Sequence, residues 1–259
     1  MITADGFGES TAANRTILEL LERGHVSSIG IMPVAPAAGE DVELLRATGR
    51  VDQCQLHFCA TSPLTGNGKW RPISKDVPTL VDDDGCLPAL GQIVEINASN
   101  RDLRRELEAQ WQWLTKQDLR PHALSTHRDL GYGKFGRDWL AQLLDFAADM
   151  QAAVRLSGTK SPATPLFDGW AEAVELAKSF DVPVPDIVLT AQRALPYASY
   201  AEFLAHCLSL LASAADATDV EFHLHVATGS SPLAEWSVQL LDDPIFLDAT
   251  SRFLVVDRW

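Results

Sequence analysis

The chain has 259 residues, a length within the range of a single α/β barrel. Hydrophobic residues make up 46% of it, enough for a large core, so intrinsic disorder is disfavoured. The formal net charge of −14 disfavours binding to nucleic acid or to an anionic membrane, and it fits a soluble enzyme for a neutral or cationic small molecule.

Short apolar segments alternate along the chain with segments of helical periodicity. The clearest of these is a helix in which Leu103, Leu107 and Trp111 recur at four-residue spacing. In chain order, the pattern predicts strand 2–4, helix 11–23, strand 26–32, helix 40–48, strand 51–58, helix 101–117, strand 123–127, helix 136–150, strand 153–156, helix 169–179, strand 186–189, helix 199–215, strand 220–226, helix 233–241 and strand 252–256.

A long loop is predicted over residues 60–100. It contains several prolines and glycines and three consecutive aspartates at 82–84. A loop of this length in a compact domain is usually functional, so we expect it to lie over the active-site face.

About seven βα units predict a single-domain α/β fold over residues 1–259, with parallel strands closed into an irregular, TIM-like barrel. In such barrels the active site lies at the C-terminal ends of the strands. Asp5, His57, His127 and His225 all fall at predicted C-terminal strand ends. The sequence therefore predicts that these four side chains share one site.

Each of these residues also has an ordinary structural explanation. Asp5 precedes a glycine-rich turn and fits a turn aspartate, and His57 fits a hydrogen-bonded core histidine. Alternation places Gln55 and His57 on one face of their strand, and His127 lies in a polar row. Both explanations stay open for each residue taken alone.

Together, a carboxylate and two neutral imidazoles form a ligand set for a catalytic zinc ion with an open water position. Such an ion lowers the pKa of bound water and polarises a carbonyl oxygen. A nearby carboxylate could then accept the water proton, and a protonated imidazole could deliver one to a departing amine. The implied reaction is hydrolysis of an amide or ester, although spacing alone does not assign the roles.

Several short motifs, in this order and spacing, resemble the YdjC/ChbG family of carbohydrate deacetylases over essentially the whole chain. The family opens with Ala-Asp-Asp-Phe-Gly, where this chain has Ala-Asp-Gly-Phe-Gly at residues 4–8. Further resemblance lies in residues 14–15, 24–28, 55–58, 121–129, 154–156 and 221–227.

The resemblance implies a divalent-metal-dependent hydrolase that removes an acetyl group from an N-acetylated amino sugar, built on an often irregular barrel. It implies that Asp5 is the catalytic base and His225 the candidate acid. It also implies that the metal ligands are His57, His127 and the residue at position 6.

Two further residues are candidates for substrate binding. Arg155 belongs to a Val-Arg-Leu segment that the family shares. Trp70 lies in the long loop, and its flat ring suits the C–H face of a pyranose, although ordinary loop packing explains it equally well.

Gly6 is the main departure from the family pattern, because it has no side chain to offer a metal. Asp5 or Asp129 could be the third ligand in its place. We therefore consider an active deacetylase, a catalytically impaired pseudoenzyme that binds a saccharide or a partner without turnover, and a structural scaffold. For a pseudoenzyme, Gly6→Asp is expected to restore metal binding.

The expected cofactor is a divalent metal ion, zinc or magnesium, and the imidazoles favour zinc. The expected partner is a small sugar or oligosaccharide rather than nucleic acid or membrane, and a homodimer is the default assembly. The cysteines lack any CxxC pair and no signal peptide is visible, so we expect reduced thiols in the cytoplasm.

Overall fold

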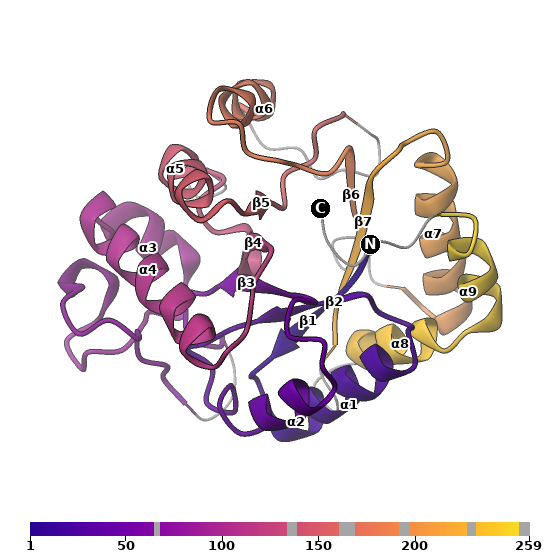
Figure 1. The fold of residues 1–259 in the computed structure, drawn as a ribbon, viewed down its shortest axis with the longest axis horizontal. Helices are drawn as coiled ribbons and strands as arrows, with labels where there is room; N and C mark the ends of the chain where they lie inside the picture. The colour runs from indigo at the N-terminus through magenta and orange to yellow at the C-terminus, as the bar shows by residue number, and fades with distance from the viewer. Residues whose placement is uncertain (65–67, 134–138, 161–168, 192–196, 227–231, 254–259) are drawn as a thin grey trace.

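The computed structural model describes residues 1–64, 68–133, 139–160, 169–191, 197–226 and 232–253. Within them, seven strands form one parallel sheet in the order β5-β4-β3-β2-β1-β7-β6. The sheet curls into a half-barrel, which confirms the predicted irregular TIM-like α/β architecture (Figure 1). The predicted closure is not seen among the described residues, because the two edge strands β5 and β6 do not pair there. The strands are β1 Ile2–Phe7, β2 Ser28–Ile31, β3 Cys54–Phe58, β4 Ala123–Thr126, β5 Ala153–Val154, β6 Ile187–Thr190 and β7 Val220–His225.

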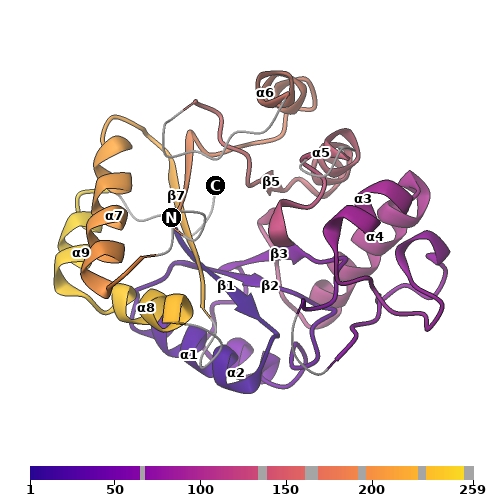
Figure 2. The same cartoon turned by 180° about the vertical axis from the view of Figure 1, so that it is seen from behind.

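The helices lie outside the curved sheet, as Figure 1 and the view from behind in Figure 2 show. Serine side chains accept hydrogen bonds from backbone N–H groups at the start of three of them, α1, α4 and α7, which satisfies donors that a helix leaves unpaired. The helices are α1 Thr11–Glu22, α2 Val42–Ala47, α3 Gly91–Asn97, α4 Asn100–Lys116, α5 Leu140–Met150, α6 Trp170–Ser179, α7 Tyr200–Ser213, α8 Pro232–Leu241 and α9 Pro244–Thr250.

Alternation along the central strands separates an apolar face from a polar one. In β1, Ala4 belongs to the hydrophobic core, whereas Thr3 and Asp5 are buried polar residues on the other face. Pairing sets Thr3 opposite His223 and Asp5 opposite His225 on β7. Polar side chains from neighbouring strands therefore meet on the same face of the sheet.

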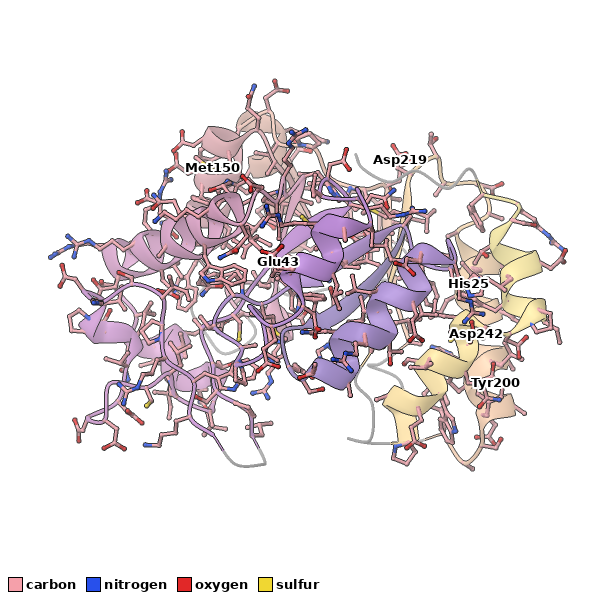
Figure 3. The ribbon with its side chains drawn as sticks, turned by 60° about the horizontal axis from the view of Figure 1, so that its bottom comes forward. His25, Glu43, Met150, Tyr200, Asp219 and Asp242 are labelled. Atoms are coloured by element: carbon pink, nitrogen blue, oxygen red, sulfur yellow. The ribbon has the colours of Figure 1, made fainter. Side chains whose placement is uncertain are left out.

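The N-terminal helix is tied to the C-terminal helices at the end of the barrel where the strands begin. His25 follows α1, and its Nδ1 lies 2.8 Å from Asp242 Oδ1, just beyond α8. Arg23 joins the same carboxylate at 2.6 Å. Figure 3 shows His25 and Asp242 side by side.

The structure differs from the predicted elements in three places. The predicted loop at 60–100 contains a 3₁₀ turn, Pro78–Leu80, and helix α3. Helix α9 was not predicted. The first two residues of the predicted strand 252–256 are not extended in a sheet, and the others lie outside the described residues, as do 136–138 of the predicted helix 136–150.

All four cysteines are buried and unpaired. Among the described residues, the helices are too short or too polar to cross a membrane.

Candidate active site

The four predicted strand-end residues meet at the C-terminal edge of the sheet. The ring centroids of His57 and His127 are 5.5 Å apart, and those of His127 and His225 are 6.0 Å apart. His57 Nδ1 lies 3.8 Å from Asp5 Oδ1. One carboxylate and three imidazoles from β1, β3, β7 and the residue after β4 thus form a single cluster.

Asp5 is held by two cationic or donor groups. Arg155 Nη1 and Nη2 donate hydrogen bonds to its two oxygens at 2.6 and 3.1 Å, and His223 Nδ1 lies 3.3 Å from Oδ2. Burial favours the protonated form, but the charge of Arg155 and the hydrogen bonds from His223 and Arg155 outweigh it and hold the pKa of Asp5 well below its ordinary value. Asp5 is therefore an ionised carboxylate with most of its hydrogen-bonding capacity in use.

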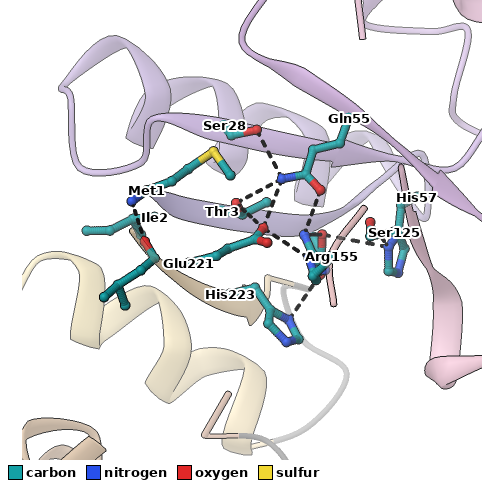
Figure 4. A network of polar contacts seen from close by, with 12 residues as sticks. Met1, Ile2, Thr3, Ser28, Gln55, His57, Ser125, Arg155, Glu221 and His223 are labelled. Carbon is teal, nitrogen blue, oxygen red and sulfur yellow. Dashed lines mark hydrogen bonds and ion pairs between the residues drawn. The ribbon is translucent and has the colours of Figure 1, made fainter. Parts of the chain in front are cut away.

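Arg155 lies beneath the site rather than at its surface, since its side chain is only 7% exposed. Besides Asp5, its guanidinium donates to Glu221 Oε1 at 2.9 Å and to Gln55 Oε1 at 3.0 Å. Gln55 and Thr3 in turn donate to the same oxygen of Glu221, as Figure 4 shows. The structure therefore places Arg155 where it positions Asp5, and it does not bring this side chain to an open surface.

His57 and His127 are neutral imidazoles. Burial lowers the pKa of His57 to about 4 and lowers that of His127 well below its ordinary value. Nδ1 of His57 lies 2.9 Å from Ser125 Oγ, which fixes the ring and leaves Nε2 for another partner. Neutral rings with a free nitrogen are the form in which histidine binds metals.

Glu9 contacts this cluster, although the sequence did not reveal it. Its Oε1 lies 2.9 Å from Nε2 of His225. Burial lowers the pKa of His225, but the hydrogen bond and charge of Glu9 outweigh it and raise the pKa above its ordinary value. The only sequence feature that could have indicated this role is a carboxylate three residues beyond Gly6. An acidic residue just before a helix is common, so this feature does not by itself indicate a site.

The backbone at Gly6 leaves no room for a side chain. Its φ of +110° is a conformation that residues with a Cβ rarely adopt. A Cβ there would lie 2.8 Å from Val226 O. The glycine is thus built into the fold of this strand end, where the register of β1 against β2 shifts.

Of the three protein ligands expected for a divalent ion, two are present at this site. The neutral rings of His57 and His127 fit such an ion, but Gly6 offers no donor and Asp5 is bonded to Arg155. Within the part of the chain that the structure describes, no three His, Cys, Asp or Glu side chains are already gathered as an ion site. Asp129, the other candidate ligand, lies two residues beyond His127 in a left-handed turn.

Trp70 is fixed in the long segment before α3. Trp70 as a whole is 9% exposed and belongs to the hydrophobic core. The backbone N–H of Trp70 donates to Ser62 Oγ at 2.8 Å, and its backbone carbonyl accepts from Leu87 N at 2.8 Å. Stacking of Trp70 on a sugar stays a prediction.

Comparison with known protein families identifies the family to which the chain belongs. The model of the YdjC-like protein family matches residues 1–250, so the chain belongs to this family.

Two individual proteins are similar to part of this chain, and both are described as carbohydrate deacetylases. The protein of Geobacillus stearothermophilus is 32% identical over 127 residues, which cover 49% of this chain and 48% of the relative. The protein of Clostridium beijerinckii (strain ATCC 51743 / NCIMB 8052) is 29% identical over 127 residues, with the same shares of both chains. The chain therefore matches about half the length of each relative.

A solved structure shares the fold over almost the whole chain. It is that of an Enterococcus faecalis protein described as a cellobiose-phosphate cleavage protein, with a TM-score of 0.78 and 24% identity. The match covers 99% of this chain and 95% of that one. At this identity, the likeness shows the fold alone.

Proposed function

We propose that this protein is a hydrolase that removes the acetyl group from an N-acetylated amino sugar or oligosaccharide. The convergence of Asp5, His57, His127 and His225 at one strand edge carries this proposal. Membership of the YdjC-like family and the two carbohydrate deacetylases among its relatives support it.

The reaction joins a water oxygen to the acetyl carbon and breaks the C–N bond, giving acetate and a free amine. Asp5 receives the water proton, and Arg155 keeps its carboxylate ionised and oriented. Because its pKa is low, Asp5 is a weak base and needs a more acidic water. A divalent ion on His57 and His127 would supply this by lowering the pKa of the water and polarising the acetyl oxygen.

His225 is the group that delivers a proton to the departing amine. Its raised pKa keeps a larger share of the ring protonated near neutral pH. The same side chain acts as an acid because Glu9 stabilises its charged form.

Acetate release from N-acetylglucosamine and its β-linked dimer tests the proposal. We expect one acetate per hydrolysed amide, loss of at least about 100-fold in kcat for His225→Gln, and abolition by a chelator. His25→Gln is the matched control, because His25 lies at the opposite end of the strands. Absence of acetate from every N-acetylated sugar tried, with a folded protein, would contradict the assignment.

A catalytically impaired protein of the same fold is the second candidate. The missing donor at Gly6 and the bonding of Asp5 to Arg155 favour it. It predicts that calorimetry detects binding of the N-acetylglucosamine dimer while no acetate appears. A cytoplasmic location and a homodimer stay predictions from the sequence.

A further inference from the structure

Glu9 lies beside the one position of the site where a side chain is missing. Residues 6–9 form a turn in which Glu9 N donates to Gly6 O at 3.1 Å. A Cβ on Gly6 would lie 3.5 Å from Cε1 and 3.6 Å from Nε2 of His225. The Glu9 carboxylate bonds that same Nε2 atom, so it reaches the ring edge nearest to Gly6.

The carboxylates of Asp5 and Glu221 are committed to the buried network. Asp5 accepts two hydrogen bonds from Arg155, and Glu221, which accepts another, is fully buried. Glu9, by contrast, is 26% exposed, and His225 is its only hydrogen-bond partner among the described side chains. Unlike Asp5 and Glu221, Glu9 can therefore take up an ion without breaking the Arg155 network.

We propose that Glu9 supplies the carboxylate ligand of a divalent cation held by His57 and His127, in place of the side chain that Gly6 lacks. This inference rests on the proposed function and names the donor that the function requires. Two imidazoles and one carboxylate are a common ligand set of catalytic zinc, and they leave a position for water. Oε2 of Glu9 would bind the ion, while Oε1 keeps its hydrogen bond to His225.

Metal binding by the chelator-treated protein tests the proposal independently of turnover. Zinc affinity is measured by competition with a chromophoric chelator, and the ligand field is read from the visible absorption of bound Co²⁺. We expect one ion per chain. Glu9→Gln should weaken zinc binding by at least about 100-fold, beyond the 10- to 100-fold effect of groups that only support ligands, and should change the Co²⁺ spectrum.

Three variants control the measurement. Glu19 lies on the exposed face of α1, so Glu19→Gln should leave zinc affinity unchanged. His127→Ala should abolish binding. Asp129→Asn should leave it unchanged, because Glu9 rather than Asp129 is the proposed ligand. Thermal unfolding of each ion-free variant verifies that it is folded.

The inference is overturned if Glu9→Gln binds zinc as tightly as the parent, if Asp129→Asn loses binding instead, or if the parent binds no ion. Acetate release separates this result from the proposed function. A parent that releases acetate while Glu9→Gln keeps its zinc refutes the role of Glu9 alone. Zinc binding that depends on Glu9, without acetate from any N-acetylated sugar, supports the ligand and refutes the deacetylase.

Discussion

Asp5 and Gly6 are neighbours in β1, yet their surroundings are opposite. Asp5 is enclosed by the side chains of Arg155 and His223, whereas Gly6 meets the backbone oxygen of Val226. A carboxylate is therefore stabilised at one position and excluded from the next. This contrast governs what substitutions at the two positions can do.

Gly6→Asp is expected to destabilise the protein by about 1–3 kcal/mol rather than create a metal ligand, because it forces a Cβ into a left-handed backbone beside Val226 O. Urea unfolding and zinc titration measure the two effects. Gly24→Asp is the control, since Gly24 has a φ of +74° but no atom within 4 Å of a Cβ. A Gly6→Asp variant of unchanged stability that gains an ion would refute this prediction.

Arg155→Met is expected to cost about 3–5 kcal/mol of folding free energy, because it leaves the buried carboxylates of Asp5 and Glu221 without their cation. Arg104→Met is the control. Arg104 pairs with exposed carboxylates on α4 and α5, and such pairs contribute about 0–1 kcal/mol. Equal losses of unfolding free energy in the two variants, measured in urea, would show that the buried ion pairs of Arg155 stabilise the fold no more than the exposed pairs of Arg104.

Among the elements, α4 fixes the long segment 60–100. Glu106 of α4 accepts hydrogen bonds from Ile73 N and Ser74 N, both at 2.9 Å, and Asp102 accepts one from Thr79 N. Arg128, which follows His127, donates to Ala89 O at 3.0 Å. The segment is thereby joined both to helix α4 and to the edge of the candidate active site.

Because the pKa of Glu106 is raised, we expect the free energy of unfolding to fall as the pH rises. Burial outweighs its hydrogen bonds and raises the pKa of Glu106 from 4.5 to about 7. The folded chain thus binds the proton more tightly than the unfolded chain. The resulting stabilisation, on the order of 3 kcal/mol, is complete below pH 4.5 and is lost as the pH rises through 7.

Urea unfolding at about pH 5 and pH 8 measures this effect. Glu106→Gln cannot titrate, so its stability should change less between the two pH values than that of the parent. The exposed Glu175→Gln serves as the control and should keep the full pH dependence. A parent and a Glu106→Gln variant with the same pH dependence would rule out Glu106 as its source.

At the scale of the whole molecule, the acidic surface predicts a response to salt. A net charge of −14 opposes the compact state through self-repulsion, and salt screens that repulsion. We expect the midpoint of thermal unfolding to rise when NaCl increases from about 10 to about 200 mM. Choline chloride should have the same effect, which separates screening from specific ion binding. A midpoint that falls in both salts would contradict the prediction.

The sequence predicted the sheet and the four clustered residues because buried strands are short apolar runs that end in polar residues. It missed α3, since Ile93 and Ile96 are exposed and give no amphipathic pattern. The roles of Arg155 and Glu9 depend on contacts 150 and 216 positions apart in the chain. Such contacts arise only when the barrel forms, so local patterns could not reveal them.

The position of β1 between β2 and β7 has a consequence for synthesis at the ribosome. Ile2 of β1 pairs with Phe222 of β7, so one edge of β1 stays open until β7 emerges. At ordinary translation rates this takes on the order of ten to forty seconds. During that interval the nascent chain presents a bare strand edge, open to a chaperone or to aggregation. The length of this vulnerable period depends on how late β7 is translated and not on the stability of the finished barrel.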